Sequence, residues 1–235
     1  MEMVNLVEVA SKCSGITSDR AFRVDDLGVN LYQELGHDWF VKLSTNFYGL
    51  VYRDPEKWFR DVFASSSQED AIQNQYEWLI ERFGGPPLFS QRKGFPGLMG
   101  RHVQHDVTEE GAMRWLLHME RALADASIPK DCKIAGEELT SALTDFFSHT
   151  AHFLAAGQRM RQGKNVLGSA QNRKNYQLQL AQDKEESQLR ETPSRMLRFM
   201  PWSGLAGWTS LKVVMLSSLL LAVATLPIFR SSRRA

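Results

Sequence analysis

Cysteine is scarce in this chain of 235 residues, which contains only Cys13 and Cys132. Two cysteines so far apart in the sequence form neither a disulfide framework nor a paired metal-binding motif. We therefore expect reduced thiols and a reducing compartment. Residues 1–12 also lack a long apolar run and an arginine-rich pattern, so we expect neither a secretory signal nor a transit peptide there.

Strand patterns are also missing, because apolar and polar residues do not alternate over any useful length. Apolar residues recur at helical spacing instead, and Phe40, Leu43 and Phe47 fall on one face of a helix expected over residues 37–52. Further helical stripes run to about residue 83, from about 113 to 126, and from about 137 to 157. The sequence therefore predicts an all-α fold.

Capping signals predict where several helices begin and end. Asp25 or Asp26 is expected to cap a helix that ends at Gly36. Pro55 is expected at the first position of a short helical turn, and one serine of residues 65–67 at the N-cap of the next helix. Two glycines and two prolines at residues 84–87 end that helix. From there to residue 102 we expect an irregular loop.

The net charge of +1 conceals an uneven distribution. Residues 1–160 carry 16 lysines and arginines against 23 aspartates and glutamates, whereas residues 161–235 carry 12 against 4. The acidic part argues against nucleic-acid binding by the helical domain. The basic part suits an anionic membrane surface.

Charge is almost absent from residues 199–229, where Lys212 is the single charged side chain. The apolar centre at 213–229 holds 17 residues, and a helix of that length spans about 25 Å, near the lower limit for crossing a bilayer. Tryptophans precede it and basic residues follow it: Trp202, Trp208, Arg230, Arg233 and Arg234. We predict a single C-terminal transmembrane helix that leaves the preceding domain in the cytosol. The alternative is a peripheral apolar helix that docks on a partner.

Several motifs follow one another in a specific order. They are Ser44–Tyr48, Glu69–Glu77, Gly84–Pro87, Ser90–Gly94, Gly100–His102, Trp115-Leu116 with His118-Met119, and Asp145–Phe147 with His149–Ala151. Together they resemble the group II truncated haemoglobins, the 2-on-2 globins, and most closely the plant and algal type. The resemblance covers residues 20–160.

The resemblance implies a 2-on-2 helical sandwich that binds haem b. The globin domain is then expected at residues 27–158, after an N-terminal extension at 1–26. A polar basic linker at 159–198 and the hydrophobic anchor with its basic tail at 199–235 would follow it.

The resemblance places the iron ligand on His102, preceded by Arg101. The residues alone do not choose among the six histidines, and His105, three positions later, competes for this role. His149 and His152 lie three apart on a predicted helix and are expected to be ordinary helix residues. An imidazole that ligates haem iron uses one nitrogen and usually donates the other N–H to a backbone carbonyl.

On the opposite face of the haem, the resemblance implies three hydrogen-bond donors, Tyr48, Gln75 and Trp115. Dioxygen held there carries partial negative charge, which donors in a dry pocket stabilise. From the residues alone, Tyr48 also fits a core aromatic with a satisfied hydroxyl, and Gln75 a solvated edge position. The resemblance adds a set of residues that pack on the haem: Phe63, which replaces a tyrosine of many relatives, Trp78 and Leu79.

Two short segments depart from the family pattern. Phe95 stands between Gly94 and Pro96 where the family usually has histidine. Val103-Gln104-His105 replaces a segment in which Pro-Phe usually follows the iron ligand by two residues. We expect the loop path and the haem contacts to differ at these positions.

The implied function is binding of O2, NO and CO at a histidine-ligated iron, with NO detoxification or a peroxidase-like side activity left open. No flavin or NAD motif accompanies the globin motifs, so sustained NO turnover would need an external reductase. The alternative is a membrane-tethered, degenerate globin that acts as a scaffold or sensor without haem turnover.

Overall fold

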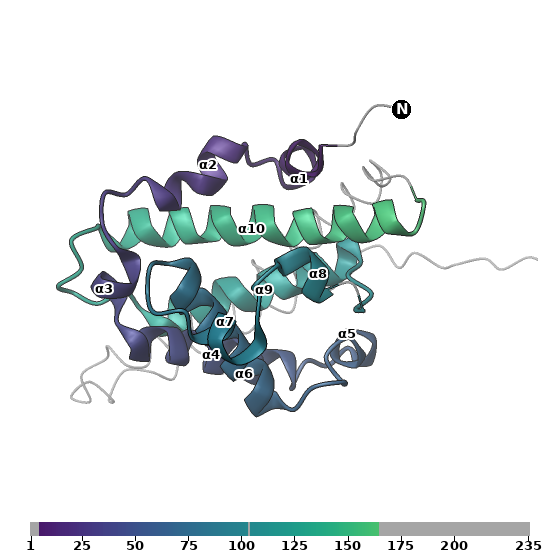
Figure 1. The fold of residues 1–235 in the computed structure, drawn as a ribbon, viewed down its shortest axis with the longest axis horizontal. Coiled ribbons are helices and arrows are strands. Elements are labelled where there is room, and N and C mark those ends of the chain that lie inside the picture. The colour runs from purple at the N-terminus through teal and green to yellow at the C-terminus, as the bar shows by residue number, and fades with distance from the viewer. Residues whose placement is uncertain (1–4, 103, 165–235) are drawn as a thin grey trace, which may run out of the picture. The chain divides into compact units, whose positions relative to one another are not determined.

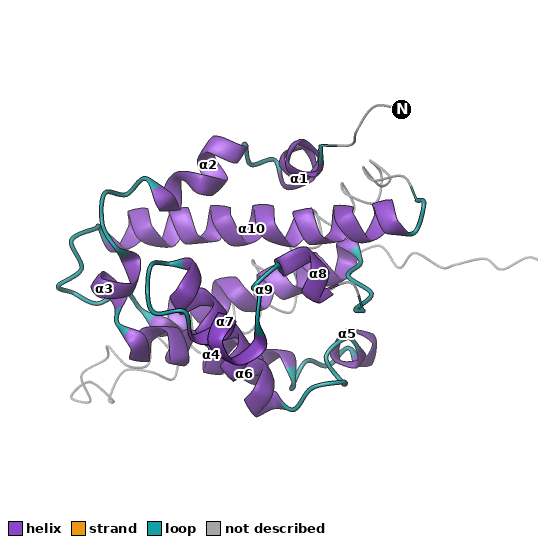
Figure 2. Ribbon diagram, in the orientation of Figure 1, coloured by secondary structure: helices purple, strands orange, loops and turns teal. Residues whose placement is uncertain are grey.

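Helices account for the regular structure of the computed structural model, which describes residues 5–102 and 104–164. Those residues contain no strand (Figure 2), so the predicted all-α class is confirmed. The α-helices are α1 Leu6–Ser14, α2 Ser18–Phe22, α3 Leu31–Leu35, α4 His37–Val51, α5 Lys57–Asp61, α6 Gln68–Arg82, α7 Leu88–Lys93, α8 Leu98–His102, α9 Glu109–Ala126 and α10 Gly136–Arg161. A 3₁₀ turn, η1, covers Arg23–Asp25.

Four long helices form the framework (Figure 1). α4 packs against α6 and against α9, and α9 packs against α10. One helix pair, α4 and α6, thus meets a second pair, α9 and α10, as expected for a two-on-two sandwich. The apolar face predicted for α4 is the face that becomes buried: Phe40, Leu43 and Phe47 are fully enclosed in one cluster with Leu139 and Leu143 of α10. Each such side chain stabilises the fold by about 1.5–3 kcal/mol.

The N-terminal helices α1 and α2 pack against α10 (Figure 1). Arg20 of α2 donates to both carboxylate oxygens of Asp145, with Nη2 at 2.9 Å from Oδ1 and Nε at 3.2 Å from Oδ2. His149 Nε2 lies 3.3 Å from Ser11 Oγ and 3.2 Å from the carbonyl oxygen of Val7, both in α1. The described part of the N-terminal extension therefore packs on the helical domain.

The prediction for the start of α3 was wrong. Asn30 is its N-cap, and its side-chain oxygen accepts a hydrogen bond from the backbone N–H of Gln33 at 3.0 Å. Asp25 instead ends η1 and pairs with Arg82 of α6 at 2.7 Å. The Asp25 carboxylate, which local spacing predicted to be a helix cap, therefore pairs with a residue far away in the sequence instead.

The turn between α4 and α5 also differs from the prediction, because α5 begins at Lys57 and Pro55 precedes it. Asp54 shapes this turn, since its Oδ1 accepts a hydrogen bond from the backbone N–H of Glu56 at 2.7 Å. The serine cap of α6 is confirmed: Ser67 Oγ accepts from the N–H of Asp70 at 3.0 Å.

The segment expected to be an irregular loop contains two short helices, α7 and α8. No side chain of its own N-cap holds the start of α7. Glu81 of α6 does so instead, because its carboxylate accepts from both the backbone N–H and the hydroxyl of Ser90. This cap comes from another helix, which explains why the glycine- and proline-rich sequence did not reveal it.

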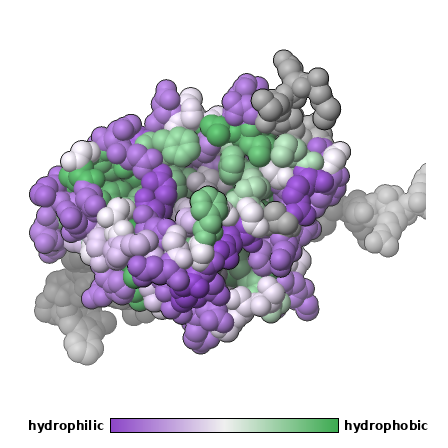
Figure 3. Space-filling model, in the orientation of Figure 1, coloured by the Kyte–Doolittle hydropathy of each residue, from purple (hydrophilic) through white to green (hydrophobic). Residues whose placement is uncertain are grey.

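Polar residues prevail in the lower half of the face shown in Figure 3, and apolar residues gather in the upper half. None of the helices in the described part of the chain is both long and apolar enough to cross a membrane. The predicted span at 213–229 lies outside the described residues, as does most of the predicted linker; α10 runs three residues past the predicted domain end at 158.

Candidate functional site

A cavity of about 370 Å³ lies among α4, α6, α8, α9 and α10. Its volume falls in the range of pockets that hold small molecules and cofactors. All of the predicted site residues line it: Tyr48, Phe63, Gln75, Trp78, Leu79, Arg101, His102 and Trp115. Residues far apart in the sequence therefore come together around one space.

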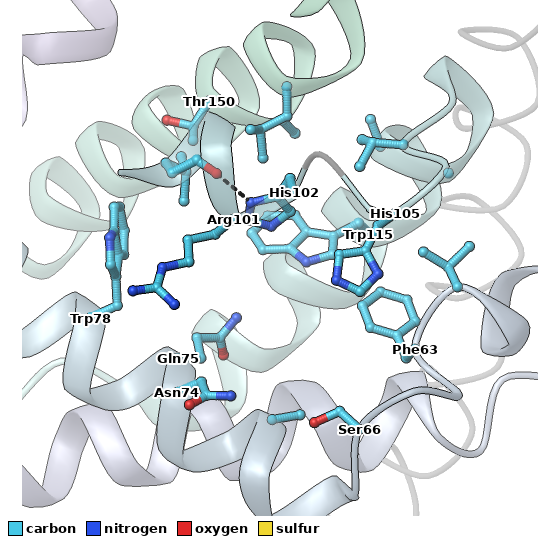
Figure 4. Close-up of a pocket in the computed structure, with 18 of the residues that line it drawn as sticks. Phe63, Ser66, Asn74, Gln75, Trp78, Arg101, His102, His105, Trp115 and Thr150 are labelled. Atoms are coloured by element: carbon cyan, nitrogen blue, oxygen red, sulfur yellow. Dashed lines mark hydrogen bonds between the residues drawn. The ribbon is translucent and has the colours of Figure 1, made fainter. Parts of the chain in front are cut away.

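His102 is the last residue of α8, so the expectation that an irregular loop carries it was wrong. Its Nδ1 lies 2.8 Å from the carbonyl oxygen of Leu98, one helical turn earlier, and donates to it (Figure 4). Nε2, the other ring nitrogen, has no recorded hydrogen bond within the described part of the chain. Burial lowers the pKa of His102, nearby His105 lowers it further, and the hydrogen bond to Leu98 opposes them. The side chain is therefore held as a neutral imidazole, the form that ligates iron.

Arg101 attaches α8 to the end of α7. Its guanidinium donates to the carbonyl oxygens of Lys93 and, at 3.2 Å, of Phe95. It also lies 5.3 Å from the ring centre of Phe89. Arg101 and Lys93 both line the cavity and give this part of its wall positive charge.

Gln75 of α6 faces the cavity from the side opposite His102 (Figure 4). Its Oε1 is buried, and no partner for it exists among the residues that the structure describes. Buried polar atoms are normally hydrogen-bonded. The amide of Gln75 is therefore a polar group that a molecule in the cavity can satisfy.

Tyr48 and Trp115 complete the polar part of the wall. The ring of Phe47 holds both, with centroids 4.9 Å from each. Within the described ranges the structure records no hydrogen bond for the phenol of Tyr48 or the indole N–H of Trp115. Burial, with a smaller effect of Tyr52, raises the pKa of Tyr48. The phenol thus keeps its proton and is available as a donor.

Apolar side chains form much of the rest of the wall, and the predicted Phe63, Trp78 and Leu79 are among them. Phe63 packs edge-on against Tyr48 with centroids 6.2 Å apart. Trp78 Nε1 donates to the carbonyl oxygen of Pro96 at 3.2 Å, which links α6 to the segment before α8. Leu79 is 2% exposed.

The two segments that depart from the family pattern differ in their position relative to the cavity. Phe95 does not line the cavity and is 85% exposed. His105 does line it, with its ring centroid 6.2 Å from that of His102, and Val103 lies outside the described residues. The sequence analysis missed wall residues that α6, α7 and α10 contribute, namely Asn74, Lys93 and Thr150. Thr150 falls within the helical stripe predicted over residues 137–157, and that stripe is the sequence signal that could have found it.

A buried polar cluster behind the wall was also missed. The carboxylate of Asp54 is fully buried, and its Oδ2 accepts from Arg114 Nε at 2.8 Å and from His118 Nε2 at 2.5 Å. Burial raises the pKa of Asp54, but the hydrogen bonds from Arg114, His118 and the Glu56 N–H together lower it. His118 packs on Phe59, a wall residue, with ring centroids 5.7 Å apart. The cluster thereby ties the turn before α5 to α9.

These features fit a haem. The wall is mainly aromatic and aliphatic, a neutral imidazole presents one free nitrogen, and the cations Lys93 and Arg101 suit the carboxylates of a porphyrin. The unpaired Gln75 Oε1 marks the side opposite the imidazole as the polar one.

Comparisons with known proteins agree with this fit. Residues 30–153 match the family described as bacterial-like globin. The chain is 48% identical over 160 residues to two-on-two hemoglobin-3 of Arabidopsis thaliana, covering 68% of this chain and 86% of that protein. It is also 48% identical over 160 residues to group 2 truncated hemoglobin 3-1 of Lotus japonicus, covering 68% and 90%.

A thermostable hemoglobin from Thermobifida fusca aligns in structure with a TM-score of 0.48 and 26% identity, over 54% of this chain and 97% of that one. The family match spans more than half of the sequence and includes all of the predicted site residues, and the two plant relatives each align over 160 residues. The chain therefore belongs to the bacterial-like globin family, as a truncated globin whose cofactor is haem.

Proposed function

We propose that this globin binds O2, and with it NO and CO, at a haem iron ligated by His102. The observation that carries the proposal is the hydrogen bond from His102 Nδ1 to the Leu98 carbonyl, because it leaves Nε2 available in a partly buried, neutral ring on the cavity wall. Haem iron bound in this way offers its opposite face to a diatomic ligand.

Three donors would act on that ligand from the chain. The phenol of Tyr48 stays protonated, the indole of Trp115 can only donate, and the NH2 of the Gln75 amide is the third donor, whereas its Oε1 can only accept. All three line the same cavity. Fixed donors in such a site stabilise a ligand with partial negative charge more strongly than water does.

Replacing His102 tests the proposal, with His105 as a matched control on the same wall. We expect His102→Ala to lose haem, or to hold it only with added imidazole, while His105→Ala keeps the ferrous–CO spectrum of the wild type. An unchanged spectrum in His102→Ala, together with its loss in His105→Ala, would transfer ligation to His105. A purified wild-type protein without a Soret band would instead support the degenerate scaffold.

NO detoxification is a finer version of the same proposal. The conversion of NO and O2 to nitrate takes one electron per turnover, so an external reductase would have to supply it. With a reductase system present, we expect NO consumption to produce nitrate in proportion and to depend on O2. Consumption of less than one NO per haem under these conditions would restrict the function to ligand binding.

We also propose that residues 213–229 anchor the globin to a membrane, with the globin in the cytosol. The support comes from the sequence: an uncharged apolar run, tryptophans before it and arginines after it. Basic residues flank the run on both sides, so charge does not orient it. Extraction with alkaline carbonate tests the anchor, because a protein that washes off is peripheral.

A further inference from the structure

The helix that carries His102 is too short to hold its own orientation. α8 has five residues, one of them Gly100, and Gly97 precedes it. Helices shorter than about 12 residues are marginal without tertiary contacts. The contacts that hold α8 in place therefore also set the orientation of the His102 imidazole. Arg101 supplies one attachment, to the end of α7.

A second attachment lies on α10, where Met99 packs over Gly157. A Cβ atom placed on Gly157 would overlap the end of the Met99 side chain, at 2.5 Å from Sδ and closer still to Cε. The same Cβ would lie 3.7 Å from Leu6 Cδ1 of α1. Gly157 thus leaves a notch in α10 that Met99 fills and Leu6 borders.

The Leu6 side of this contact is itself held in place. Leu6 packs on a small apolar cluster formed by Val9 and Cys13 of α1 with Ala156 of α10. The contacts of His149 with Ser11 and Val7, given above, lie on the same helix pair. Three helices that are far apart in the sequence, α1, α8 and α10, therefore meet at Gly157.

We propose that Met99 is a positioning residue for the iron ligand, and that its seat in the Gly157 notch, bordered by Leu6, sets the orientation of α8 and of the His102 imidazole. Met99 adjoins Leu98, whose carbonyl accepts the hydrogen bond from His102 Nδ1. A rotation of α8 that lifts Met99 out of the notch also moves that carbonyl. The N-terminal helix thereby acts on the haem site without touching the cavity. This inference rests on the proposed ligation by His102.

Gly157→Ala in the full-length, haem-loaded protein tests the inference. Only the flexible end of Met99 stands in the way of the new methyl group, so the fold survives and Met99 is displaced. We expect a shifted or broadened iron–histidine stretching band in the resonance Raman spectrum of the ferrous protein. Haem loss to excess apomyoglobin should become about fivefold faster or more, the lower end of what overpacking costs.

Gly100→Ala is the matched control. It makes the same change within α8, at a position where a Cβ meets nothing within 4 Å. We expect its iron–histidine band and haem loss to match the wild type. Leu6→Ala, which removes the border of the notch from the α1 side, should shift the band in the direction of Met99→Ala.

The double variant Met99→Ala/Gly157→Ala separates this role from general destabilisation. With no long side chain left to displace, it should behave as Met99→Ala alone, because the two changes act on one contact. If the effects of the two single substitutions on the iron–histidine band and on haem loss added up in the double variant, Met99 would not be a positioning residue. An iron–histidine band unchanged in both Gly157→Ala and Met99→Ala would also overturn the proposal. A wild-type spectrum without any iron–histidine band would overturn ligation by His102 itself.

Discussion

The buried carboxylate of Asp54 provides a stringent test of the packing behind the haem cavity. Asp54→Asn keeps the shape of the side chain and one oxygen for the Glu56 N–H, but it removes the charge that Arg114 and His118 share. The Asp54 side chain is 0% exposed, that of His118 is 6% exposed and that of Arg114 is 22% exposed. Water therefore cannot replace the lost partner at His118 and replaces it only partly at Arg114.

Removing one member of a buried ion pair costs about 3–5 kcal/mol. The partial exposure of Arg114 and the oxygen that Asn retains place Asp54→Asn near about 3 kcal/mol on that scale. The free energy of unfolding decreases by about 1–3 kcal/mol per M of urea, so the urea concentration at the unfolding midpoint should fall by about 1–3 M. The melting temperature should fall by about 6–12 °C for a domain of this size.

Urea unfolding followed by circular dichroism measures the effect, with wild type and variant at equal haem saturation. Asp61→Asn is the matched control, because Asp61 makes an exposed pair with Lys57 one turn away in α5, and such pairs contribute less than about 1 kcal/mol. If Asp54→Asn destabilised the protein no more than Asp61→Asn, the cluster would not be what fastens the turn before α5 to α9.

Three further outcomes are expected. Trp115→Phe should speed O2 release by roughly ten- to a hundredfold, since a hydrogen bond to a charged acceptor contributes about 1.5–3 kcal/mol; Tyr48→Phe should act in the same direction, and unchanged stopped-flow rates in both would remove these side chains from ligand control. Burial lowers the pKa of His118, His149 and His152 from 6.5. Below pH 6.5 the unfolded chain therefore binds more protons than the folded one, so the free energy of unfolding, measured in urea, should fall as the pH drops. His118→Gln removes one of these titrating groups and should make that fall less steep. Deleting residues 199–235 should leave the Soret band intact and move the protein to the soluble fraction; loss of haem would show that this segment supports the globin.

Patterns confined to one helix were predictable where neighbouring side chains alone decide them. The buried face of α4 followed from the spacing of Phe40, Leu43 and Phe47, and the serine cap of α6 followed from a residue one turn away from its partner. The motif resemblance brought the site residues to attention, and all of them line one cavity. Their roles in binding stay predictions until ligand kinetics test them.

Errors arose where a partner far away in the sequence decides the local structure. Asp25 was expected to cap a helix but pairs with Arg82, so Asn30 caps α3 instead. The carboxylate of Glu81 holds the start of α7, within a segment whose glycines and prolines predict a loop. A propensity summed over neighbours contains no information about such partners.

The sequence by itself determined the helical class and the long amphipathic helices, because these depend on residues within a few turns of one another, whereas the histidine motif was singled out by its resemblance to a family. Only the tertiary structure decided that His102 ends a short helix, that a buried Asp54 joins the turn before α5 to α9, and that Met99 occupies the notch at Gly157. Each of these depends on side chains from distant segments that exclude water together. Their energies exist only once the chain has folded.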